Sequence, residues 1–136
     1  MNAHGDVLNA TAETPEEVER LVTELKTRGN AAFKVRQLPT AVTLYSKALE
    51  HDPKAHAIFG NRSMSQLAMG KFEEALEDAD AAIAISEEWA KGHFRRAKAL
   101  TALDRHAAAL GAIRRAVELA PDDKSLKKEV CLPPAV

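Results

Sequence analysis

The segment Ala41-Val-Thr-Leu-Tyr-Ser-Lys-Ala48-Leu49 has two counterparts further along the chain, each displaced by 34 residues. Its first alanine returns as Ala75 and then as Ala109. Four further sets follow the same step: Ala48, Ala82 and Ala116; Val42, Leu76 and Leu110; Leu49, Ile83 and Val117; Gly29, Ser63 and Ala97. Five sets in one register, without an insertion, predict an internal repeat of three units.

Each period has the pattern of two helices joined by a short turn. The turns within the periods are expected at Gln37-Leu38, Gly70-Lys71 and Asp104-Arg105, and the breaks between them at Asp52-Pro53, Ser86-Glu87 and Ala120-Pro121. The first helix is expected over about 15–36, because Thr14 can cap it, Pro15 suits its first position and Glu17 completes a capping box. Gly29 inside that helix indicates a close approach of two helices. The sequence therefore predicts an all-α solenoid of antiparallel helix pairs.

Composition excludes several classes of protein. The 136 residues suit one domain, and only 4% of them are aromatic, which favours close-packed helices over a sheet. The net charge of −1 indicates no general attraction to nucleic acid, and no run is long and apolar enough for a membrane span. With a single cysteine, Cys131, no zinc spacing and no catalytic motif, we expect no metal, no cofactor and no enzyme activity. We expect a monomer located in the cytoplasm, or also in the nucleus.

The domain boundaries follow from the repeat. Residues 1–13 show no period, so we expect a disordered leader there. The domain is expected over 14–130, with repeats at about 22–55, 56–89 and 90–123 and a short capping helix at 122–130. Residues 131–136 are expected to form a tail.

The 34-residue period, an early small residue, two alanines seven apart and a proline near the end of the unit resemble the tetratricopeptide repeat. The resemblance covers about residues 22–124. It implies a right-handed superhelical array of three helix-turn-helix repeats, whose concave face is lined by the first helix of each pair. The cap is shorter than is usual in this family, which suggests a piece of a longer protein.

Positive charge is concentrated on that concave face. Lys91 and Arg95 project from one helical face, one turn apart, and Lys98 follows one turn later. Three cations on one stripe repel each other, so they indicate an anion that belongs to another molecule. The same face of the earlier inner helices adds two lysines, two asparagines and no acid: Lys26, Asn30, Lys34 and Asn61. We expect such a groove to bind carboxylates, because charged donors and amides converge on it from separate helices.

The five residues Lys26, Asn30, Asn61, Lys91 and Arg95 resemble the dicarboxylate clamp of chaperone-binding tetratricopeptide domains. The resemblance implies a co-chaperone or adaptor that binds the acidic Glu-Glu-Val-Asp C-terminus of the cytosolic seventy- or ninety-kilodalton heat-shock chaperones. It implies that the side chains of the tail contact Phe33, Met64, Leu67, Phe94 and Lys98. Ala68 is a departure, since several family members have a further cation there.

Other interpretations remain open from the sequence. Each cation taken singly is best explained as a solvated helix charge. The groove could instead bind another acidic segment that is internal rather than C-terminal. The chain could also be the targeting domain of a longer enzyme, such as a phosphatase, a peptidyl-prolyl isomerase or a ubiquitin ligase. Arg28, Arg62 and Arg96 recur at one repeat position, and we expect them to pair with acids on neighbouring helices.

Overall fold

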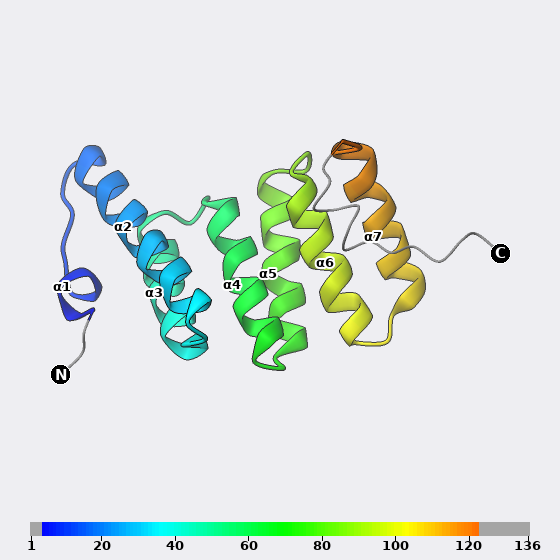
Figure 1. Cartoon of the computed structure of the whole chain (residues 1–136). Coiled ribbons are helices and arrows are strands. Elements are labelled where there is room, and N and C mark those ends of the chain that lie inside the picture. The colour runs from blue at the N-terminus through cyan, green and yellow to red at the C-terminus, as the bar shows by residue number, and fades with distance from the viewer. Residues whose placement is uncertain (1–3, 123–136) are drawn as a thin grey trace.

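The computed structural model describes residues 4–122, and all regular structure within this range is helical. The helices are α1 (Gly5–Leu8), α2 (Pro15–Lys34), α3 (Leu38–His51), α4 (His56–Ala68), α5 (Phe72–Ile85), α6 (Ala90–Ala102) and α7 (His106–Leu119). They follow one another along an elongated row, with α1 and α7 at opposite ends (Figure 1). The predicted cap at 122–130 and tail at 131–136 lie outside the described residues, apart from Asp122.

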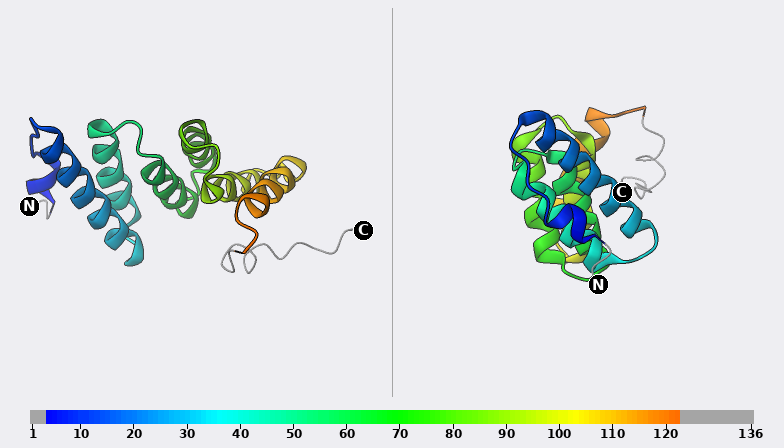
Figure 2. Two further views of the ribbon diagram at one scale, coloured as in Figure 1. Left: turned by 90° about the horizontal axis from the view of Figure 1, so that it is seen from above. Right: turned by 90° about the vertical axis from the view of Figure 1, so that its left-hand side faces the viewer.

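The helices form antiparallel pairs in two layers. The pairs α2–α3, α4–α5 and α6–α7 make the most extensive contacts, and α3 and α5 connect each pair to the next. Helices α2, α4 and α6 also contact one another in series, so they form one inner layer (Figure 2). The superhelical array predicted from the repeat is confirmed.

Small residues lie where the helices of a pair meet. The six alanines of the repeat are almost completely buried: Ala41, Ala48, Ala75, Ala82, Ala109 and Ala116. Gly29 marks the close approach that its place in a helix predicts. A Cβ atom at Gly29 would lie 2.5 Å from Cε1 of Tyr45, which is only 2% exposed. Only glycine therefore lets the Tyr45 ring lie against α2.

The period also governs the turns within each pair. Arg36, Gly70 and Asp104 are 34 residues apart and have positive φ angles of 64°, 80° and 61°. In each turn the next residue donates its backbone N–H to a carbonyl five residues back, as Lys71 does to Gln66 at 2.9 Å. This is the Schellman arrangement, which satisfies carbonyls at the end of a helix. Arginine and aspartate therefore hold a backbone conformation that glycine adopts more easily.

The three arginines at one repeat position pair with acids, as predicted. Arg62 donates from Nε and Nη2 to the two carboxylate oxygens of Asp78, at 2.6 and 2.7 Å. Arg96 donates to Asp80 at 2.8 Å in a more exposed pair. Asp78 is 6% exposed, so this acid of α5 is buried in its pair with Arg62 on α4.

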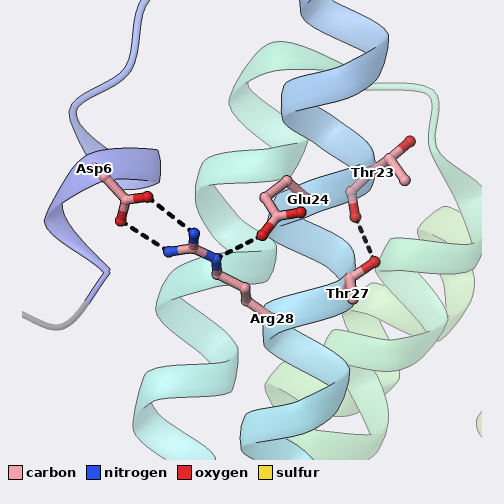
Figure 3. Close-up of polar contacts among 5 residues, drawn as sticks. All are labelled: Asp6, Thr23, Glu24, Thr27 and Arg28. Atoms are coloured by element: carbon pink, nitrogen blue, oxygen red, sulfur yellow. Dashed lines mark hydrogen bonds and ion pairs between the residues drawn. The ribbon is translucent and has the colours of Figure 1, made fainter.

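The amino-terminal segment differs from the disordered leader that we expected. Residues 5–8 form α1, and Val7 is buried against the core of α2 and α3. Arg28 donates to both oxygens of Asp6, at 2.8 and 2.9 Å, and to Glu24 at 2.8 Å (Figure 3). The bidentate pair lowers the pKa of Asp6. Contacts with α2 and α3 therefore hold this segment in place. Such tertiary contacts leave no periodic pattern in the sequence from which they could be predicted.

Candidate peptide-binding groove

Three adjoining pockets cross the inner layer. The first, about 310 Å³, is lined by Asn30, Phe33, Lys34, Tyr45, Asn61 and Met64. The second, about 400 Å³, is lined by Phe33, Met64, Leu67, Ala68, Phe94, Arg95 and Lys98. The third, about 410 Å³, is lined by Leu67, Phe72, Phe94, Ala97, Lys98, Thr101, Ala102 and Ile113. Neighbouring pockets share lining residues and so adjoin one another, and together they are here called the inner groove.

The lining of the inner groove contains cations and amides but no carboxylate. Lys34 comes from α2, and Arg95 and Lys98 come from α6. The net charge of the chain is −1, so this local charge reflects segregation rather than composition. A groove with these side chains attracts anionic segments and disfavours cationic ones.

The five residues predicted to contact ligand side chains come together in this groove. Phe33, Met64, Leu67, Phe94 and Lys98 all line its second pocket. Phe94 is 5% exposed and packs with Ala116, so most of its ring belongs to the core. The Arg95 guanidinium and the Lys98 ammonium lie 5.8 and 5.4 Å from the centre of that ring. Phe94 therefore lines the groove and holds the charged groups of Arg95 and Lys98 by cation–π contacts with its ring.

The two predicted asparagines are in direct contact. Asn61 on α4 donates from Nδ2 to Oδ1 of Asn30 on α2, at 3.1 Å. Tyr45 on α3 donates its hydroxyl to the same Oδ1 at 2.6 Å. Burial raises the pKa of Tyr45 to about 12, so the hydroxyl keeps its proton at neutral pH. Three helices thus meet at one amide group on the groove wall.

Lys26 and Lys91 lie at less enclosed positions than the asparagines. Lys26 is one turn before Asn30 on α2 and borders a different pocket, of about 630 Å³. Lys91 is exposed on α6, one turn before Arg95. The structure therefore places Asn30, Asn61 and Arg95 in the inner groove, with Lys26 lining the neighbouring pocket.

That neighbouring pocket was not predicted. It lies between the first half of α2 and the start of α4, with an apolar floor that includes Val18, Val22 and Ile58. Glu13, Glu19 and Asp52 also line it, so it differs in charge from the inner groove. The first predicted repeat begins at about residue 22, but α2 begins at Pro15. Residues 15–21 therefore extend the helix beyond the repeat and form one wall of this pocket.

Tyr45 is a groove residue that the sequence interpretation missed. Its counterparts one and two periods later are Ala79 and Ile113, so it is the one polar aromatic residue at this repeat position. Its partner Gly29 is likewise the smallest of its own set. The sequence did contain a signal for this contact. The first repeat combines the largest residue of one set with the smallest residue of the other, as expected where the two positions pack together.

Residues 4–122 contain neither a metal-binding cluster nor a membrane-spanning helix. No group of three or more His, Cys, Asp or Glu side chains there could hold a metal ion. None of the helices in that range has the length and apolar character needed to span a bilayer.

A model of the tetratricopeptide repeat matches residues 26–88 and 61–124. The chain belongs to the tetratricopeptide repeat family. The tetratricopeptide fold is a protein-interaction module, and its repeats stack into an extended concave surface.

Two relatives contain a similar tetratricopeptide region within a longer chain. The protein STIP1 homolog of Dictyostelium discoideum is 38% identical over 105 residues, which are 77% of this chain and 19% of the relative. Serine/threonine-protein phosphatase 5 of Homo sapiens is 38% identical over 104 residues, which are 76% of this chain and 21% of the relative. The chain thus spans about a fifth of the length of each.

Solved tetratricopeptide domains have the same architecture. The first such domain of Spaghetti (RPAP3), bound to the HSP90 peptide SRMEEVD, is 28% identical with a TM-score of 0.75 over 80% of this chain and 86% of that domain. The second domain of human RPAP3, in complex with the HSP70 peptide SGPTIEEVD, is 27% identical with a TM-score of 0.76 over 83% of this chain and 94% of that domain.

Proposed function

We propose that the inner groove binds the acidic C-terminal tail of a cytosolic heat-shock chaperone, and that the protein acts as a co-chaperone or adaptor. One observation carries the proposal: Asn30 and Asn61, from two different helices, meet at 3.1 Å in a groove whose lining has no carboxylate. Amides placed among cations provide directed donors for an anion.

A C-terminal aspartate suits this arrangement because one residue supplies two carboxylates. In the proposed complex, Asn30 and Asn61 donate to the terminal carboxylate and the aspartate side chain, and Lys26 and Lys91 add charge from either side. Arg95 holds the tail further from its end or shares the aspartate. Phe33, Met64 and Leu67, which line the middle of the groove, contact the preceding valine.

The likeness to two domains bound to chaperone peptides supports this choice of ligand. Both of those peptides end in Glu-Glu-Val-Asp. With either the seventy- or the ninety-kilodalton chaperone as partner, the protein would act in the cytoplasm.

A second candidate function concerns the whole protein. The tetratricopeptide region of phosphatase 5 forms only 21% of that enzyme. By the same organisation, the present chain would be the targeting domain of a longer enzyme, and the groove would bring that enzyme to the chaperone.

Peptide binding tests the groove directly. Fluorescence anisotropy with labelled SRMEEVD should give a dissociation constant of roughly one micromolar, on the order of −8 kcal/mol. The same peptide with an amidated C-terminus should bind about tenfold more weakly, because a charge-assisted hydrogen bond is worth about 1.5–3 kcal/mol and the groove is open to solvent. Added salt should weaken the binding of the free acid. Equal affinity for the two peptides would contradict the proposal and favour an internal acidic segment.

A further inference from the structure

Both acceptor positions of one groove amide are occupied from within the protein. Oδ1 of Asn30 accepts a hydrogen bond from the Tyr45 hydroxyl at 2.6 Å and a second from Nδ2 of Asn61 at 3.1 Å. A carbonyl oxygen has two lone pairs, so this oxygen has no acceptor capacity left for a ligand. Within residues 4–122, Nδ2 of Asn30 makes no hydrogen bond, and Asn30 lines the inner groove.

The orientation of the amide is fixed by its neighbours. Turning the Asn30 amide over would bring its Nδ2 against Nδ2 of Asn61, which also carries only donors. Both amides would therefore have to turn together. The turned pair would present an oxygen of Asn30 to the groove, where it would repel a carboxylate.

The position of Tyr45 is itself determined by close packing. The Tyr45 ring is 2% exposed and lies against the backbone of Gly29, where a Cβ atom would come within 2.5 Å of the ring. The residue after Gly29 is Asn30, so the contact that places the ring also brings its hydroxyl to the amide. Because the ring is fixed by this packing, its hydroxyl stays within hydrogen-bond distance of Asn30.

We propose that Tyr45 is a positioning residue, which holds the Asn30 amide with its N–H groups toward the groove and so makes the site selective for a terminal carboxylate. This role rests on the proposed function, because it concerns the same groove and the same class of ligand. A carboxylate accepts hydrogen bonds from an amide held in this way. A C-terminal amide brings N–H groups of its own, for which the Asn30 oxygen is not available.

The test compares Tyr45→Phe with the wild-type protein, using SRMEEVD as free acid and as C-terminal amide. The substitution keeps the ring and removes only the hydroxyl, so the packing on Gly29 is retained. Affinity for the free acid should fall about fivefold, the equivalent of one hydrogen bond of about 1 kcal/mol, while affinity for the amide should not change. Selectivity for the free acid that is the same as in the wild type would overturn the proposal.

Ser63→Ala is the matched control. Ser63 is 1% exposed and donates its hydroxyl to the carbonyl of Ala75 at 2.6 Å, on the side of α4 that faces α5. Its loss should lower the melting temperature comparably and leave peptide selectivity intact. An equal loss of selectivity in Ser63→Ala would show a general effect of destabilisation and would overturn the role of Tyr45.

A double-mutant cycle shows whether Tyr45 acts through Asn30. In an Asn30→Ala background, Tyr45→Phe should have no further effect on affinity for the free acid, and an additive loss would contradict the mechanism. A second measurement uses the wild-type protein alone. In nuclear magnetic resonance spectra, the signals of the Asn30 side-chain N–H groups should shift when the free acid peptide is added, and much less when the amidated peptide is added. Unchanged signals with the free acid would also overturn the proposal.

The outcomes separate the two proposals. A wild-type protein that binds both peptides equally contradicts the proposed function, and the role of Tyr45 with it. A selective wild type whose selectivity survives Tyr45→Phe overturns the role of Tyr45 alone.

Discussion

Gly29→Ala should destabilise the protein, although alanine is the better helix former. The added Cβ would lie 2.5 Å from Cε1 and 2.8 Å from Cδ1 of Tyr45, and the ring has no room to withdraw because it is 2% exposed. Overpacking of this kind costs about 1–3 kcal/mol. The gain in helix propensity offsets about 1 kcal/mol of that cost. We therefore expect a net loss of up to about 2 kcal/mol in the free energy of unfolding.

The chain provides a matched control for helix propensity. Gly111 lies within α7, is exposed, and has no atom within 4 Å of an added Cβ. Gly111→Ala should therefore stabilise the protein by about 1 kcal/mol. The difference between the two substitutions isolates the steric cost at Gly29, about 1–3 kcal/mol.

Urea unfolding followed by far-ultraviolet circular dichroism measures both variants. Because repeat arrays can unfold in steps, the transition should also be followed by Trp89 fluorescence. If Gly29→Ala stabilises the protein as much as Gly111→Ala does, the close approach of α2 and α3 is wrong. Peptide binding gives an independent check, because a displaced Tyr45 ring would also break its hydrogen bond to Asn30 and weaken binding of the free acid.

Three further predictions concern the charges. Lys91→Ala and Arg95→Ala should each weaken binding of SRMEEVD at least about fivefold, with little change in helical content; a large loss of stability without loss of binding would make these residues structural. Asp78→Ala should cost about 3–5 kcal/mol, because it leaves the Arg62 guanidinium without its buried partner, whereas Arg96→Ala should cost less than about 1 kcal/mol; similar urea midpoints for the two variants would contradict this difference. The pKa of Asp6 is held below its usual 3.8 by the Arg28 hydrogen bonds, so the contribution of this pair is present above that value and is lost as the pH falls through the folded-state pKa. Hydrogen exchange of α1 should accelerate over that acidic range, and Asp6→Asn should show the faster exchange already at neutral pH; equal exchange in both proteins would show that the pair does not hold α1.

The repeat register was predictable because small residues must recur where helices approach. Ala41, Ala75 and Ala109 mark these contacts directly, and their spacing was enough to predict paired helices. The period also predicted which arginines would pair, since Arg62 on α4 and Arg96 on α6 hold equivalent positions and both reach acids of α5.

Features that depend on a single tertiary contact were not predictable in this way. Val7 and Asp6 form no pattern in the sequence, and α1 is held by a core and an arginine that other segments supply. Asp78 looks like any surface acid until the reach of Arg62 is known. The period identified the groove face, but the complementary sizes of Tyr45 and Gly29 within their repeat sets were not considered, so the link from Tyr45 to Asn30 was missed.

The packing of Tyr45 on Gly29 has an evolutionary consequence. A larger residue at 29 alone creates a clash, and a smaller residue at 45 alone creates a cavity and removes one of the two donors to Oδ1 of Asn30. The two positions are therefore epistatic, and a viable path to another pair must change both. Gly29 and Tyr45 belong to the same repeat, so an exchange of whole repeats carries both residues, whereas a crossover between α2 and α3 separates them and loses the ligand preference.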